Sequence, residues 1–157
     1  MSTPMEMSGL NEFERDLLDA CLDGADPVLA TLRAQADGVR VERREDEPDG
    51  VRSFFALPDA VATVEPAAIH ISDVDPHIQG LADGASVSLW VIGGRLAFLE
   101  VLAYDGAWPS SPRLLGLRYL REHQIGPGTW SATPVDARDA DTLARALAGV
   151  QPNEYAG

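Results

Sequence analysis

The segment Ala85-Ser-Val-Ser-Leu-Trp-Val-Ile-Gly-Gly-Arg-Leu-Ala-Phe-Leu-Glu-Val-Leu-Ala-Tyr104 decides the fold. Two apolar runs flank Gly93-Gly94, and a glycine pair favours the positive φ angles of a two-residue turn between antiparallel strands. The segment therefore predicts a β-hairpin. Because both of its faces are mainly apolar, we expect it to be central in a sheet, covered on both sides, or on one side by protein and on the other by a partner.

Glu100 is the only acidic residue in the second run of this hairpin. Regular pairing across the glycines places Val91 opposite Leu96, Leu89 opposite Phe98 and Val87 opposite Glu100. A desolvated carboxyl has a raised pKa unless it gains a positive partner or several hydrogen bonds. Glu100 is therefore a candidate general acid or base, or the acid of a structural pair with Arg52, Arg95 or Arg118. We favour the structural role.

Helical patterns are expected towards both ends of the chain. Residues 10–22 have helical apolar spacing, and Asp26-Pro27 is a typical start for a second helix over 27–36. The two should form an αα-hairpin. A last helix is expected from Asp136, as its N-cap, to Ala148, with Ala140, Leu143, Ala144 and Leu147 facing inward.

Extended patterns lie between the helices, over residues 39–44, 51–57, 68–72 and 129–135. Asp75-Pro76 is expected to close the third of these strands. Residues 113–123 favour a strand, with a helix as the alternative. The fold class is therefore α+β: a single domain over 10–150, with an N-terminal αα-hairpin packed on a mainly antiparallel sheet and a C-terminal helix. Residues 1–9 are expected to be disordered and 151–157 to be a tail.

Charge is the strongest global signal in the 157 residues. Asp and Glu number 25 against 12 basic residues, all of them Arg, which gives a net charge of −13. Such a chain repels nucleic-acid phosphates and anionic membranes, so neither is an expected direct partner. A basic protein would instead be attracted. The start of the chain lacks a secretory pattern and the single cysteine, Cys21, has core spacing, so we expect a cytoplasmic location.

The segment from His70 to His77 concentrates polar side chains. His70, Asp73, Asp75 and His77 could each bind a divalent metal, but a strand that ends in a turn explains the same residues. The chain has no HExxH, CxxC or EF-hand pattern and no nucleotide-binding glycine motif. We therefore expect no metal, no cofactor and no enzymatic activity. A small enzyme or metal-binding module using Glu100 and this segment stays as an alternative.

Two parts of the chain resemble a widespread type of small, uncharacterised bacterial protein. The first is Leu17-Leu18 with Gly24-Ala-Asp-Pro-Val-Leu-Ala-Thr-Leu-Arg33, and the second is the hairpin from Gly84 to Glu100 with Tyr104 and Trp108-Pro109 after it. Residues 110–157 lie outside the resemblance. It implies a fold and no established activity. By analogy, small acidic proteins of this style are often immunity partners of secreted toxins.

Together these patterns predict an acidic binding protein, an immunity- or antitoxin-type inhibitor of a basic toxin or nucleic-acid-processing enzyme. Aromatic anchors and surface acids should carry the contact. The candidate contact residues are Glu12, Asp16, Asp19, Asp23, Glu45, Asp46, Glu47, Tyr104 and Trp108. A homodimeric scaffold, joined through the apolar hairpin, is the second hypothesis.

Overall fold

A computed structural model describes residues 8–150, which form three helices and two antiparallel sheets. The α+β class is thus confirmed. The helices are α1 (Glu12–Cys21), α2 (Pro27–Asp37) and α3 (Ala140–Leu147). Of the segments expected to be disordered or a tail, 1–7 and 151–157 lie outside the described residues, and Ser8 pairs with Val41.

The larger sheet has five strands in the order β1-β2-β6-β5-β3. Its strands are β1 (Arg40–Glu47), β2 (Gly50–Ala56), β3 (Ile69–Ile71), β5 (Ala85–Ile92) and β6 (Arg95–Ala103). The smaller sheet has three strands in the order β4-β7-β8. These are β4 (Val74–Ile78), β7 (Leu114–Gly126) and β8 (Thr129–Val135).

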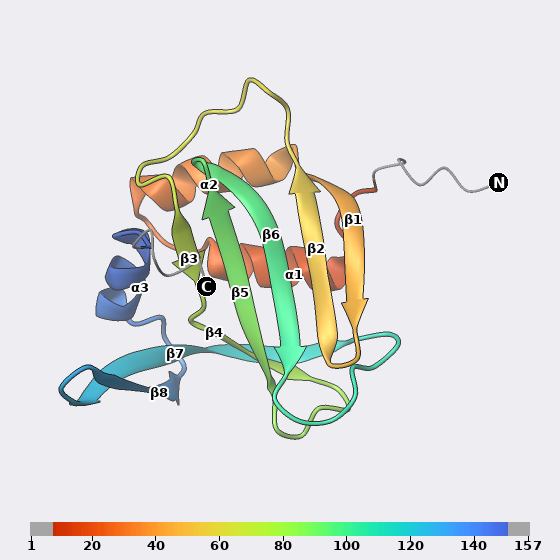
Figure 1. Cartoon of the computed structure of the whole chain (residues 1–157), viewed down its shortest axis with the longest axis vertical. Helices are drawn as coiled ribbons and strands as arrows, with labels where there is room; N and C mark the ends of the chain where they lie inside the picture. Colours follow the sequence, from red (N-terminus) through yellow and green to blue (C-terminus); the bar gives the residue numbers. More distant parts are fainter. Residues whose placement is uncertain (1–7, 151–157) are drawn as a thin grey trace.

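The two N-terminal helices lie against one face of the five-stranded sheet, which we call the inner face (Figure 1). Alternate residues of the central strands point to this side and are buried with the helix residues, among them Val87, Leu89, Leu99 and Val101. Cys21 also lies in this core, and burial raises the pKa of its thiol to about 12. The other face of the sheet, here the outer face, has no described element over it (Figure 1).

Side-chain caps set the starts of the helices. Asn11 and Glu14 form a reciprocal capping box at α1, and Asp26 accepts a hydrogen bond from the Val28 amide at α2, as the Asp26-Pro27 pair predicts. The start expected for the last helix is wrong. Asp139, not Asp136, caps α3, because its carboxylate accepts from both the amide and the hydroxyl of Thr142.

The α3 residues that face inward also differ from the expected set. Thr142 and Leu147 are buried, whereas Ala140 and Ala144 are exposed. The later start explains part of this difference, since it leaves Ala140 in the first, solvent-facing turn of the helix.

The glycine turn of the hairpin is confirmed, with φ of 63° at Gly93 and 76° at Gly94. The pairing of Val91 with Leu96 is also confirmed, but the rest of the expected register is wrong. Ala97 is an extra residue in β6, so that Trp90 pairs with Phe98, Leu89 with Leu99 and Val87 with Val101. A one-residue slip moves every later side chain to the opposite face. Glu100 therefore lies on the outer face, opposite Ser88.

The smaller sheet tests two expectations, the strand or helix over residues 113–123 and the strand end at Asp75-Pro76. Residues 114–126 form one long strand, which decides against the helix alternative. Asp75-Pro76 does not close a strand but lies inside β4. Proline is tolerated there because β4 is an edge strand of its sheet, so no ladder hydrogen bond is lost on its free side.

Gln35 joins α2 to the hairpin and is only 1% exposed. Its amide nitrogen donates to the carbonyls of Ala62 and Gly94, at 2.8 and 3.0 Å, and its amide oxygen accepts from the Leu96 amide at 2.9 Å. One side chain thus satisfies three backbone groups around the glycine turn. Nothing in the local sequence pattern marks it as a core residue.

We predict that Gln35→Leu lowers the free energy of unfolding by about 1–3 kcal/mol, because it leaves buried backbone groups without partners. Urea denaturation followed by circular dichroism measures this loss. The control is Gln124→Leu on the exposed surface of β7. Equal stability of the two variants would contradict the role given to Gln35.

Candidate partner-binding site at the loop end of the sheet

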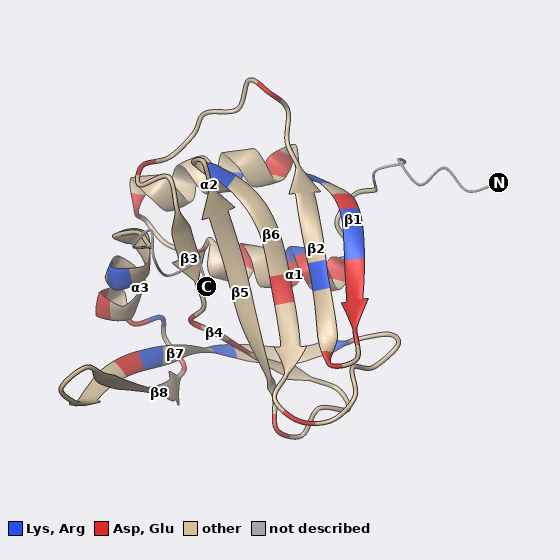
Figure 2. Ribbon diagram, viewed as in Figure 1, with Lys and Arg blue, Asp and Glu red and all other residues tan. Residues whose placement is uncertain are grey.

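Three loops meet at one end of the five-stranded sheet, which we call the loop end. They are the β1–β2 turn at 47–50, the loop at 79–84 and the loop at 104–113. Backbone hydrogen bonds hold the last of these against the other two: the Trp108 amide donates to Pro48, and the Tyr104 amide donates to Gly84, each at 3.1 Å. The loop end lies at the bottom of Figure 1, and Figure 2 shows acidic residues on these loops.

Trp108 lies in a groove of about 360 Å³ between the start of α1, strands β1 and β2, and residues 108–112. We call it the Trp108 groove. The indole meets Phe13 edge-on, with the ring centres 6.0 Å apart. Asp46 and Glu47 line the same groove and are exposed. Among the described residues, neither carboxylate has an ion-pair partner within 4 Å.

Glu14 forms the polar wall of the Trp108 groove, and its side chain is only 4% exposed. Arg44 donates to its two oxygens at 2.7 and 2.8 Å, and the Ser53 hydroxyl donates to one of them. Burial alone would raise the pKa of this carboxyl, but the hydrogen bonds from Arg44, Ser53 and the Asn11 amide hold the pKa below its ordinary value. Glu14 is therefore ionised and fully paired at neutral pH.

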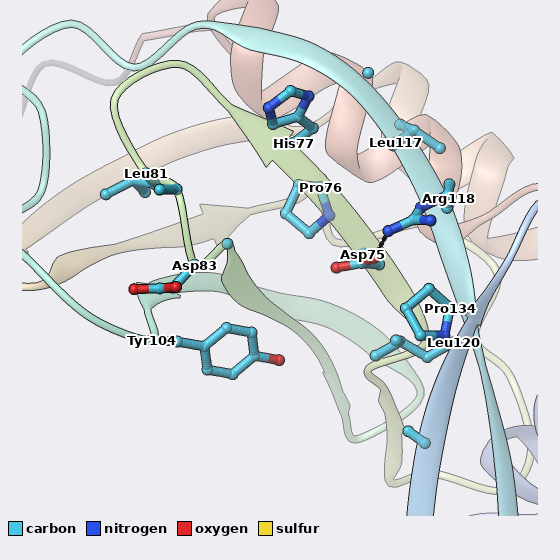
Figure 3. Close-up of a pocket in the computed structure, with 14 residues that line it drawn as sticks. Asp75, Pro76, His77, Leu81, Asp83, Tyr104, Leu117, Arg118, Leu120 and Pro134 are labelled. Carbon is cyan, nitrogen blue, oxygen red and sulfur yellow. Dashed lines mark hydrogen bonds and ion pairs between the residues drawn. The ribbon is translucent and has the colours of Figure 1, made fainter.

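Tyr104 lies on the other side of the same loop, at a hollow of about 580 Å³ that we call the Tyr104 hollow (Figure 3). Asp75 and Asp83 also line it. Asp75 accepts from Arg118 at 3.3 Å, whereas no ion pair holds Asp83 within the described part of the chain. The pKa of the Tyr104 hydroxyl is raised by partial burial and by the negative charge of Asp75.

Each hollow thus combines an aromatic side chain with at least one exposed carboxylate that has no ion pair among the described residues: Asp46 and Glu47 beside Trp108, and Asp83 beside Tyr104. A guanidinium or ammonium group is held by an aromatic face through cation–π attraction and by carboxylates through charged hydrogen bonds. The geometry therefore suits the arginine or lysine side chains of a protein. Because both hollows flank the single loop 104–113, two such side chains could be bound at once.

The predicted contact residues differ in where they lie relative to the two hollows. Asp46, Glu47 and Trp108 share the Trp108 groove, and Tyr104 lies in the hollow beside it. Glu12 opens α1 between Asn11 and Phe13, both of which line the groove.

The remaining predicted residues line neither hollow. Glu45 faces the outer side of the sheet and is paired with Arg43 at 3.4 Å. Asp16, Asp19 and Asp23 are exposed along and just after α1. They add negative charge to the surface but are not gathered around an aromatic anchor.

The residues of the alternative enzyme or metal hypothesis do not converge on one cavity. His70 stacks on Trp90 with ring centres 4.1 Å apart, and Glu100 is paired with Arg52, as the structural interpretation predicts. Asp73 is buried and held by two 2.8 Å hydrogen bonds from Arg138.

Asp75 and His77 share the Tyr104 hollow, and His70 and Asp73 line a different one of about 410 Å³, so that the set is divided between two places. In residues 8–150, no group of three or more His, Cys, Asp or Glu side chains is arranged to hold a metal ion. Nor does any helix in this range have the length and apolar character needed to cross a bilayer.

Three residues of the site were not anticipated: Glu14, Arg44 and Asp83. Glu14 could have been found, because Asn11-x-x-Glu14 has the spacing of a capping box. The alternation of β1 gives no reason to expect that Arg44 pairs with a helix. Asp83 belongs to a loop whose place beside Tyr104 depends on the tertiary fold.

Comparisons with protein-family models, with curated proteins and with solved structures found no match to this chain.

We predict that Glu14→Gln lowers the free energy of unfolding at pH 7 by about 2–3 kcal/mol, since it removes charged hydrogen bonds from Arg44. The folded-state pKa of Glu14 lies below its ordinary value of 4.5, so this stabilisation is complete above that value and disappears as the pH falls through the folded-state pKa. Urea denaturation over a pH series should therefore show wild type and variant converging in acid. Glu12→Gln, at an exposed neighbour, is the control. A deficit that is constant with pH, or no deficit, would contradict this assignment.

Proposed function

We propose that this chain is an acidic binding protein that holds a basic protein partner at its loop end, as an immunity- or antitoxin-type inhibitor acting in the cytoplasm. The observation that carries the proposal is an aromatic anchor beside exposed carboxylates that have no ion pair among the described residues, found on either side of one loop. The N-terminal helix pair and the hairpin that resemble small bacterial proteins of this style are consistent with it.

The state of the carboxylates favours an interaction with an external cation. Buried acids are paired within the molecule, Glu14 with Arg44 and Asp73 with Arg138. At the loop end, by contrast, Asp46, Glu47 and Asp83 are exposed, and no ion pair engages them among the described residues. An arginine or lysine that enters either hollow would gain a charged hydrogen bond without breaking an existing pair there.

The net charge of −13 supports the same class of partner. Proteins that bind or cleave nucleic acid use lysine and arginine to contact phosphates, so their binding surfaces are basic. An acidic protein is steered towards such a surface and competes there with nucleic acid. The acids along and just after α1, Asp16, Asp19 and Asp23, would add to this long-range attraction while the loop end supplies the anchors.

We predict that neutralising the loop end abolishes partner capture. The test variant is Asp46→Asn/Glu47→Gln/Asp83→Asn, and the wild type, used as bait in an extract of the native host, should retain a protein with an excess of Lys and Arg. The variant should retain at least about tenfold less of it, because loss of hot-spot contacts costs more than about 1.4 kcal/mol. Quantitative mass spectrometry of the retained proteins provides the measurement.

The matched control is Asp16→Asn/Asp19→Asn/Asp23→Asn, which changes the net charge by the same amount along and just after α1. It should slow association but retain most of the partner, since steering acts mainly on the on-rate. Retention of the same partner by all three proteins, capture by none of them, or a larger loss in the control would each refute the assignment to the loop end.

A further inference from the structure

Strand β8 is an edge strand whose outer edge is open. It is the last strand of the three-stranded sheet, and six of its seven residues are exposed. Besides its ladder with β7, no backbone hydrogen bond reaches it from the described residues. The hairpin of β7 and β8 projects from the rest of the molecule at the lower left of Figure 1. The outward-facing backbone groups of β8 are therefore accessible to another strand.

The pairing of β7 shows which groups of β8 point outward. The Leu120 amide donates to the carbonyl of Asp73, just before β4, so the backbone of Leu120 points away from β8. In an antiparallel pair, the residue directly opposite then points away as well. That residue is Pro134, and strand alternation gives Ala132 and Trp130 the same direction. The outer edge thus offers the amides of Trp130 and Ala132 and the carbonyls of all three residues.

The other edge strands of the two sheets are protected against pairing with another chain. β1 carries a charged side chain at seven of its eight positions, and Ser8 pairs with Val41 on its free edge. β3 is a short strand beside α3, and the Val150 amide donates to Ala68 just before it. β4 contains Pro76. Charges, short strands, covering elements and prolines are the usual means by which edges are protected.

β8 lacks most of this protection. Its sequence, Thr129-Trp-Ser-Ala-Thr-Pro-Val135, contains no charged residue, although 24% of the chain is charged. Pro134 removes one outward amide and leaves the other two. An exposed edge strand without charges is a ready template for strand addition.

The surroundings of this edge favour a second copy of the chain. Strands β7 and β8 carry Arg118 and Arg121 against Glu122, a net charge of +1 in a chain of −13, so a second acidic copy meets little like charge there. Large hydrophobic side chains are also exposed on these two strands, namely Leu115, Ile125 and Trp130. Exposed apolar surface of this kind marks interaction sites. A basic partner, by contrast, finds no carboxylate on β8.

β8 is complementary to a second copy of itself when Ala132 lies on the two-fold axis. In that antiparallel register, the two Ala132 residues donate to each other's carbonyls, and each Trp130 amide donates to the Pro134 carbonyl of the other copy. Every outward amide thus has an acceptor, and the missing amide of Pro134 costs no donor.

Side chains match in the same register. Trp130 lies directly opposite Pro134 of the other copy, and Ser131 lies opposite Thr133, so that apolar groups meet each other and hydroxyls meet each other. The Trp130 ring is oriented by the Arg145 guanidinium, 4.7 Å from its centre, and still leaves 48% of the residue exposed. Asp136, the first acid after β8, comes opposite the hairpin turn of the other copy and not opposite another acid.

We propose that two copies of this chain associate by antiparallel pairing of their β8 strands, which joins the two three-stranded sheets into one continuous sheet. The interface is isologous, since both copies use the same edge. Ala132 and Pro134 also line the Tyr104 hollow, so the two sites are neighbours, but strand pairing needs no carboxylate there. The proposal therefore does not rest on the function proposed for the loop end.

Analytical ultracentrifugation of the full chain up to about 0.5 mM tests the proposal. The wild type should approach twice its 16.8 kDa mass. Its dissociation constant should fall between about 0.05 and about 0.5 M NaCl, because salt screens the repulsion between two chains of −13. Binding of a basic partner at the loop end should weaken under the same change.

Ala132→Pro removes an outward amide that the β7 ladder does not use. It should raise the dissociation constant at least about tenfold, since both hydrogen bonds at the axis are lost. Ala132→Thr, which keeps the amide at the same position, is the matched control and should leave the dimer unchanged. Circular dichroism and thermal melting show whether each variant is folded.

A charge swap provides a second test that does not depend on the proline variant. Ser131→Glu/Thr133→Glu places like charges opposite each other between the copies and should weaken the dimer. Ser131→Arg/Thr133→Glu places opposite charges there and should restore it. Within each copy, these positions pair with His123 and Arg121 of β7, so neither variant sets like charges opposite each other in the monomer. Both are measured at about 0.5 M NaCl, where net charge is screened.

Four outcomes would overturn the proposal: a monomer at every concentration, loss of the dimer in Ala132→Thr, a dimer that survives folded Ala132→Pro or the double glutamate variant, and no recovery with the arginine–glutamate pair. Partner capture at the loop end has no part in these measurements. Failure of that function and failure of the β8 dimer are therefore distinguishable.

Discussion

The buried carboxylate of Glu14 is the interaction on which the candidate site depends. A desolvated charge is tolerated only when nearby donors replace the lost water, and here Arg44 of β1, Ser53 of β2 and the Asn11 amide do so. These partners come from three different parts of the chain. The carboxylate therefore fixes the start of α1 against the edge of the sheet, and so shapes the wall that faces Trp108 in the groove.

The surplus of acidic charge is divided unequally over the molecule. Acids in the interior are matched by arginines, and acids on the outer sheet face alternate with arginines along the strands. The loop end differs from both, because its exposed carboxylates stand beside Tyr104 and Trp108 without such matching. This contrast is the reason why we propose the loop end as the site of a cationic partner.

Local patterns in the sequence were sufficient for the helix starts at Asp26-Pro27, the turn at Gly93-Gly94 and the α+β class, since each depends on the φ angles or capping groups of a few adjacent residues. They failed where one residue changes a register, as Ala97 does in β6, or where two nearby aspartates compete for a cap, as Asp136 and Asp139 do. The site was predicted only in part. Trp108, Asp46 and Glu47 could be named as surface anchors, but their meeting in one groove, and that of Asp83 with Tyr104, requires contacts between loops distant in sequence.

The most direct measurement is a titration of the isotopically labelled protein with arginine amide, followed by nuclear magnetic resonance. If the loop end recognises cationic side chains, the indole N–H of Trp108 and the signals of Tyr104 should shift and reach saturation. Those of the α1 acids, which lack an aromatic neighbour, should shift little and without saturation. Equal shifts along α1 and the loops, or no saturable shift at either ring, would show that the acidic charge of this chain creates no localised cation site.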